Sequence, residues 1–201
     1  MRLLTGTGTA IALAAALSGC SIGGLLGGGG KPPTTLVTLT PEAAAPAQMV
    51  RTASAGQSVT IGIPAVPKEL GYARVPVQLT PTNVQYVTNL QLIDTPDRLF
   101  QGLLEETVRR TTGRVVLDPA QSTLDPGVSL TGQLQRFGYD ASTGQVVVTY
   151  DATMSTPGAA VVQTRRFTGS APADGTAPTV GPALNRAANQ VALDVARWIA
   201  G

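Results

Sequence analysis

The chain has 201 residues, enough for one domain with a tail, and its 43% hydrophobic and 13% charged content is too apolar for a chain disordered throughout. The net charge of +2 comes from scattered Lys and Arg without a dense basic stripe, so we expect no nucleic-acid partner. Histidine is absent and cysteine occurs once, which excludes the usual catalytic triad, an intrachain disulfide and a Cys-rich zinc site.

The first twenty residues have the layout of a secretory signal. Arg2 precedes an apolar run over residues 3–17, which is too short for a membrane-spanning helix of about 20 apolar residues. The run ends in a quartet that resembles the bacterial lipobox: Leu17, Ser18, Gly19 and Cys20. This resemblance implies that residues 1–19 are removed as a signal peptide. It also implies that Cys20 carries a diacylglycerol on its thiol and an acyl chain on the new N-terminus, which together give stable anchoring.

The residue after the cysteine bears on the membrane in which the anchor sits. In Gram-negative lipoproteins resembling this one, Asp at that position tends to retain the protein at the inner membrane. Ser21 therefore favours the outer membrane, with the protein facing the periplasm. Residues 20–33 then form a Gly-rich tether that ends in a Pro pair, and we expect the folded domain over residues 34–201.

Strand patterns open the domain. Residues 34–40 are rich in β-branched side chains, and residues 58–63 alternate with Val59, Ile61 and Ile63 on one face. Two further candidate strands follow over residues 75–79 and 84–93.

A helix begins next, because Asp94 or Thr95 can cap it and Pro96 fits its first turn. Gly113 supplies a stop signal. One apolar stripe runs along it: Leu99, Phe100, Leu103, Leu104 and Val108. The glutamates and arginines of the other face are spaced for i,i+4 pairs on a solvated surface.

The second half predicts an antiparallel meander and a terminal helix. After a short strand at 115–117, residues 128–137, 145–154 and 159–168 are candidate strands, the first with a bulge near its end. Residues 182–200 follow with apolar positions at helical spacing. These patterns predict an α+β fold, in which a mixed or mostly antiparallel sheet carries both amphipathic helices on one face.

Recognised catalytic motifs are absent from the sequence. It has no G-x-S-x-G elbow, no H-E-x-x-H and no glycine-rich nucleotide fingerprint. We therefore expect a non-enzymatic protein with no catalytic residue, no metal and no cofactor beyond the lipid on Cys20. A periplasmic hydrolase that uses Ser or Asp remains an alternative.

Three stretches resemble the auxiliary lipoproteins of ABC-type transporters, the partners of lipid-handling systems that contain MCE-domain proteins. Residues 36–41 are similar to the opening strand of that family. Residues 75–104, with Tyr86, are similar to its strand, Tyr-containing stretch and Pro-capped helix. Residues 134–137 and 144–152 are similar to its meander.

The resemblance implies an accessory lipoprotein that docks an MCE-domain protein and an ABC permease and ATPase, and it leaves a homo-oligomer open. Thr34 and Thr35 stand where the family often has Tyr, and Leu90 or Leu92 where it often has Trp. A partner-binding surface is then expected around Tyr86, Leu90 and Leu92, although these residues also fit an ordinary strand. The alternative role is an assembly lipoprotein that supports an outer-membrane machine.

Overall fold

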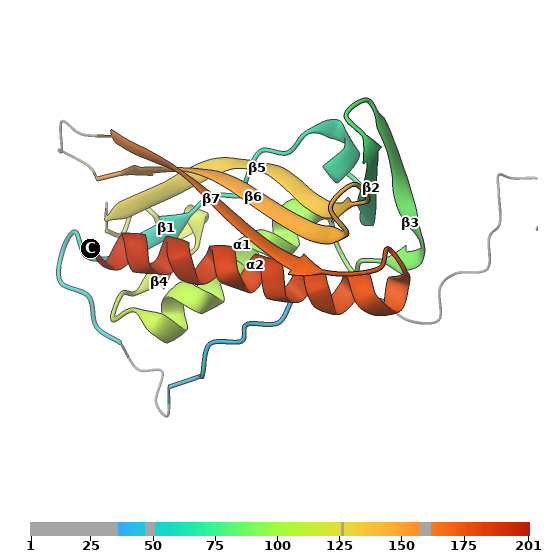
Figure 1. The fold of residues 1–201 in the computed structure, drawn as a ribbon. Coiled ribbons are helices and arrows are strands. Elements are labelled where there is room, and N and C mark those ends of the chain that lie inside the picture. The colour runs from blue at the N-terminus through green and yellow to red at the C-terminus, as the bar shows by residue number, and fades with distance from the viewer. Residues whose placement is uncertain (1–35, 47–50, 126, 157–161) are drawn as a thin grey trace, which may run out of the picture. The chain divides into compact units, whose positions relative to one another are not determined.

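The computed structural model describes residues 36–46, 51–125, 127–156 and 162–201 (Figure 1). The signal peptide, the lipobox and the tether lie outside the described residues. Within the described ranges, no helix combines the length and the apolar character needed to cross a membrane.

A mixed sheet forms the centre of the domain, and its described part has seven strands. The strands are β1 (Val59–Ile61), β2 (Arg74–Thr80), β3 (Asn83–Gln91), β4 (Val116–Leu117), β5 (Val128–Asp140), β6 (Gln145–Ser155) and β7 (Val162–Pro172). Strand β5 organises the sheet, because β6 pairs along one of its edges while β1 and β2 share the other. The pairs of β1 with β4 and β5, and of β2 with β5, are parallel, whereas all hairpin pairs are antiparallel. Two short 3-10 helices, η2 (Lys68–Leu70) and η3 (Pro119–Gln121), lie in the connections.

The predicted meander is confirmed as the antiparallel succession β5, β6 and β7. Its expected bulge occurs between Leu134 and Arg136, where the register against β6 shifts. The shift allows both Leu134 and Phe137 to be buried, although they are three residues apart and would face opposite sides of a regular strand.

Both helices, α1 (Pro96–Thr111) and α2 (Ala177–Ala200), pack on the same face of this sheet (Figure 1). On α1, Phe100 meets Tyr150 of β6 edge to face, with ring centroids 5.3 Å apart. On α2, Trp198 meets Phe167 of β7, the strand neighbour of Tyr150, at 5.6 Å. The α+β class is therefore confirmed.

Gly169 of β7 shows how closely helix and sheet approach. A Cβ atom added there would lie 2.3 Å from the carbonyl oxygen of Ala187 on α2. Only glycine leaves room for this contact, since real Cβ atoms do not come so near to a backbone oxygen.

The bounds of α1 follow the sequence prediction, with Thr95 as its N-cap, whereas the start of α2 departs from it. Helix α2 begins at Ala177 instead of Pro182, with Pro178 in its first turn and Pro182 inside the helix. Pro182 is tolerated because it is exposed and close to the helix start, where few backbone bonds are lost. Helix α1 ends without a left-handed glycine at Gly113; instead the Thr112 hydroxyl donates to the carbonyl of Val108 at 2.8 Å.

Two strand predictions are also wrong in part. Residues 36–40 of the expected first strand form only an isolated bridge between Val37 and Leu92. Strand β1 ends at Ile61, and Ile63 is 49% exposed instead of facing the core with Val59. Beyond β1 the chain pairs with β5 again only at an isolated bridge between Ala65 and Gln133, so the regular alternation on which the prediction depended stops before Pro64.

Candidate functional site

The chain reaches the domain as an extended segment, which we call the strap and define as residues 36–46. Val37 begins it by donating its N–H to the carbonyl of Gln91 at 2.9 Å, and its carbonyl accepts the N–H of Ile93 at 3.0 Å. On its other side Val37 lies in van der Waals reach of Gly181 on α2. The strap therefore starts between the end of β3 and the first turns of α2.

Two asparagines on α2 hold the next part of the strap. The Asn185 side chain accepts the N–H of Thr40 at 2.8 Å, and the Asn189 side chain accepts the N–H of Glu42 at 2.8 Å. Asn189 also donates to the carbonyl of Thr40 at 2.9 Å, and it is completely buried. Asn185 and Asn189 are one helical turn apart, so they face the same side of α2 and act as two consecutive backbone clamps.

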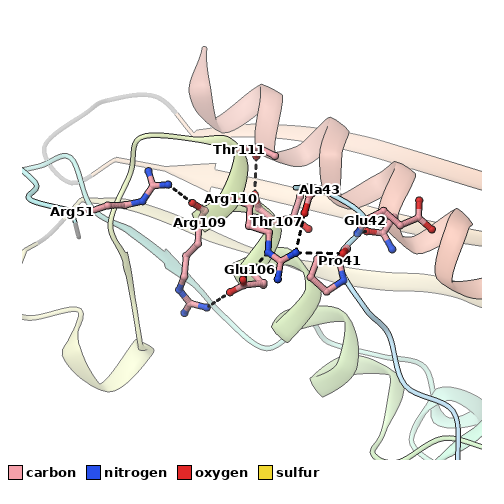
Figure 2. Close-up of polar contacts among 10 residues, drawn as sticks. Pro41, Glu42, Ala43, Arg51, Glu106, Thr107, Arg109, Arg110 and Thr111 are labelled. Carbon is pink, nitrogen blue, oxygen red and sulfur yellow. Dashed lines mark hydrogen bonds and ion pairs between the residues drawn. The ribbon is translucent and has the colours of Figure 1, made fainter. Parts of the chain in front are cut away.

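One arginine, Arg110, holds the strap's later part, and a second, Arg51, binds the end of α1, as Figure 2 shows. Arg110 of α1 donates to the carbonyl of Ala43 at 2.9 Å while its Nε donates to Glu106 at 2.7 Å. Arg51 donates to the carbonyls of Arg109, at 2.6 Å, and Thr112, so it also serves the last carbonyls of α1. Cations suit this position because the C-terminal end of a helix carries partial negative charge.

The strap is thus fixed to both helices by contacts that only the tertiary structure supplies. Only Val37 pairs with a neighbouring strand's backbone; the polar backbone groups of Thr40, Glu42 and Ala43 are paired with asparagine and arginine side chains instead. The chain therefore enters the domain at one defined place, beside the start of α2.

The expected partner-binding residues do not share one surface. Leu90 and Leu92 are buried, with 5% and 1% exposure, so the structure favours their interpretation as ordinary strand residues. The cause is a bulge in β3: Pro76 pairs with Tyr86 and Arg74 with Gln91, so Val87 to Leu90 face a single residue of β2. Asn89 takes a left-handed conformation there, with φ 58°, and the bulge turns Leu90 toward the core.

Tyr86 alone of the three is half-exposed. Its hydroxyl donates to the carbonyl of Glu69 at 3.1 Å, its ring meets Tyr72 edge to face at 6.5 Å, and the Arg74 guanidinium lies 5.7 Å from its ring centroid. Tyr72 is 52% exposed, a residue that sequence reasoning missed because it lies in a connection with no periodic pattern. A binding role for Tyr86 stays a prediction.

Hydrogen bonds hold the pKa of two carboxyl groups, Asp140 and Asp174, well below the usual range. Hydrogen bonds from Ser142 and Arg136 lower the pKa of Asp140 to about 2, and hydroxyl bonds from Thr176 and Thr179 lower the pKa of Asp174 to about 2. Such carboxylates are stable anions at neutral pH and cannot act there as proton donors. In the described ranges no cluster of His, Cys, Asp and Glu could hold a metal ion.

Comparison with known proteins identifies the family of this chain. A family model described as the ABC-type transport auxiliary lipoprotein component matches residues 38–196. The match covers most of the chain, which therefore belongs to this family of lipoprotein components of ABC-type transport systems in the cell envelope. A search of curated proteins returned no match.

Solved structures share the fold at low sequence identity. A crystal structure of a Xanthomonas campestris protein of family DUF330 is 17% identical, with a TM-score of 0.64, over 82% of this chain and 91% of that chain. The crystal structure of an uncharacterized protein is 18% identical, with a TM-score of 0.60, over 75% of this chain and 96% of that chain. At such identities the likeness concerns the fold alone.

Proposed function

We propose that this protein is the tethered accessory subunit of an MCE-associated transporter that moves phospholipid or another hydrophobic substrate between the two membranes. Cys20, acylated within the lipobox, would anchor it in the outer membrane, and the folded domain would dock transporter components in the periplasm. The ATPase would be a separate chain, because the sequence holds no nucleotide-binding motif.

The observation that carries this proposal is the clamped strap. The strap fixes the place at which the tether joins the folded domain, through Asn185, Asn189 and Arg110, and a tether holds the domain near its membrane partners. Residues 21–35 lie between Cys20 and the strap, and this length of chain spans at most about 55 Å when fully extended. The tether therefore limits how far the start of the strap can lie from the membrane.

The experiment is a mild-crosslinking pull-down from native envelopes, with Cys20→Ala as the test variant and Ser21→Ala as the matched control. We expect an MCE-domain protein and its ABC permease to be enriched with the wild-type chain and with Ser21→Ala. Enrichment should fall with Cys20→Ala, which has no thiol to acylate. Mass spectrometry of the mature N-terminus checks that Cys20 carries acyl chains in the wild-type chain and in Ser21→Ala.

Two results would count against the proposal. Recovery of an outer-membrane β-barrel without an MCE-domain protein would favour the assembly role. Equal enrichment with Cys20→Ala would mean that tethering is not part of docking.

A further inference from the structure

Strand β7 has an open edge over most of its length. Its residues pair with β6 from Val162 to Pro172 without a register shift, and among the described residues no strand pairs with its other side. An unpaired edge of this length presents backbone donors and acceptors that can accept a further strand.

Three contacts show which residues of β7, odd-numbered or even-numbered, direct their backbone N–H and C=O groups away from β6. The N–H of Ser170 donates away from β6, to the side chain of Gln190 on α2 at 3.3 Å, whereas the N–H of Ala173 donates toward β6, to the carbonyl of Gly144 at 3.1 Å. Arg166 and Asp151, a directly opposed pair, form an ion pair with Nε–Oδ1 at 2.6 Å. Close side chains are typical of pairs that exchange no backbone bonds.

Even-numbered residues of β7 therefore direct their N–H and C=O groups outward. Thr164, Arg166 and Thr168 belong to this set, and all three are exposed. Pro172 has the same parity, and its missing N–H costs nothing on the open side. Ser170 is the one position where α2 covers the edge, so the free stretch ends there.

A hollow of about 630 Å³ with aromatic and charged walls borders this free stretch. Arg165 and Phe167 of β7 line it together with Asp194, Arg197 and Trp198 of α2, and Arg197 is ion-paired with Asp194 at 3.1 Å. The Arg165 guanidinium lies 5.2 Å from the Phe167 ring centroid, and no acidic side chain pairs with it within the described part of the chain. The rings of Phe167 and Trp198, 5.6 Å apart, connect β7 and α2 at this hollow.

Charged side chains on an edge strand often only prevent aggregation. Arg166 fits that role, because Asp151 neutralises it on the face away from the helices. Prevention of aggregation does not explain Arg165. Its guanidinium lies over the Phe167 ring at the rim of the hollow, where a side chain of an added strand would lie.

We propose that the free edge of β7 binds an extended, acidic segment of a partner protein by strand addition. The backbone of Thr164, Arg166 and Thr168 would form the new ladder, a carboxylate would meet Arg165, and an apolar side chain would enter the hollow beside Trp198.

This inference deepens the docking function proposed above and rests on it for its biological setting. Its test uses a synthetic peptide and not the transporter, so the two can fail separately. If the peptide fails while the pull-down recovers the transporter, only the edge proposal falls. If the peptide binds while the pull-down fails, only the transport proposal falls.

The probe is a soluble nine-residue peptide in which every second residue is Thr and the others alternate between Glu and Val, so that one face carries both an acidic and an apolar side chain. A version with Lys in place of Glu is its control, and each peptide is added to the full chain purified in detergent. Amide hydrogen exchange should slow at Thr164, Arg166 and Thr168, by about tenfold at saturation, with the acidic peptide only. Thr164→Pro removes one outward N–H and should weaken binding by about three- to tenfold, whereas Thr164→Val keeps the N–H and should bind normally.

Folding of Thr164→Pro is checked by the inward amides of Gln163 and Phe167, which should remain protected. Arg165→Glu, which leaves the backbone unchanged, should weaken the acidic peptide and favour the Lys peptide. Four outcomes would overturn the proposal: no slowing of the outward amides, equal binding of both peptides, protection that rises with protein concentration alone, or the same protection from anionic vesicles without peptide. The third outcome would indicate a second copy, and the fourth a membrane contact.

Discussion

The side chain of Asn189 lies 2.8 Å from the backbone nitrogen of Glu42, so a completely buried amide on the terminal helix binds a segment 147 residues earlier in the chain. The same side chain donates to the carbonyl of Thr40. One residue thus satisfies both a donor and an acceptor of the strap, and the attachment of the tethered end depends on it.

Asn189→Ala should therefore destabilise the domain by about 1–3 kcal/mol, because it leaves a strap N–H and carbonyl without their partner. Hydrogen exchange at Glu42 should also become faster. Urea denaturation measures the first effect, and Arg186→Ala, an exposed substitution on the same helix, is the control with little expected change. Equal stability of both variants would contradict the clamp.

Arg110→Lys should loosen the strap although the charge is kept. Arginine contacts Glu106 and the carbonyl of Ala43 at once through its planar fork, whereas lysine has a single nitrogen. We expect a loss of about 0.5–1.5 kcal/mol and faster proteolysis within the strap. Arg98→Lys, exposed on the same helix, should change neither quantity, and an unchanged cleavage rate in Arg110→Lys would refute the assignment.

Gly169→Ala should be among the most damaging single-methyl changes in the chain. Its Cβ would lie 2.3 Å from the carbonyl oxygen of Ala187, so α2 must move away from β7. The expected cost is at least about 2 kcal/mol. Gly102→Ala on α1 is the matched control, since its Cβ meets nothing within 4 Å. Alanine there should stabilise the protein by about 0.5–1 kcal/mol, because it favours the helix more than glycine does.

Stability should fall in acid through Asp140 and Asp174. The pKa of each is lowered to about 2 in the folded protein, by Ser142 and Arg136 in one case and by Thr176 and Thr179 in the other. A carboxyl whose folded pKa lies below its unfolded value of about 3.9 adds stability above that value and loses it as pH falls toward the folded pKa.

We therefore expect the urea midpoint to decline as pH is lowered from about 4.5 to about 2. Asp174→Asn should have a lower midpoint at neutral pH and a flatter acid limb than the wild type. If the urea midpoint of the double variant Asp174→Asn, Asp140→Asn falls with pH as steeply as that of the wild type, other groups govern the acid response.

Local patterns in the sequence determined much of the architecture. The alternation in residues 145–154, turn residues on either side and the slip between Leu134 and Phe137 predicted the meander and its bulge, because each depends on side chains near in sequence. The apolar stripes of both helices were predicted for the same reason. The lipobox and the tether are also sequence features, and Cys20 stays a prediction because it lies outside the described residues.

Only the tertiary structure decided where the strap and the buried face of β3 lie. Residues 36–40 have strand-like composition, yet only Val37 pairs with a strand, and the backbone of Thr40 pairs with side chains of α2, which no local rule can foresee. Tyr86 and Leu90 are four residues apart and would face the same side of a regular strand. The bulge around Asn89 instead buries Leu90 and leaves Tyr86 half-exposed. The open edge of β7 is likewise a matter of strand order, because an edge exists only once the neighbours of every strand are known. These features depend on contacts between residues distant in the chain, and such contacts become visible only in the folded molecule.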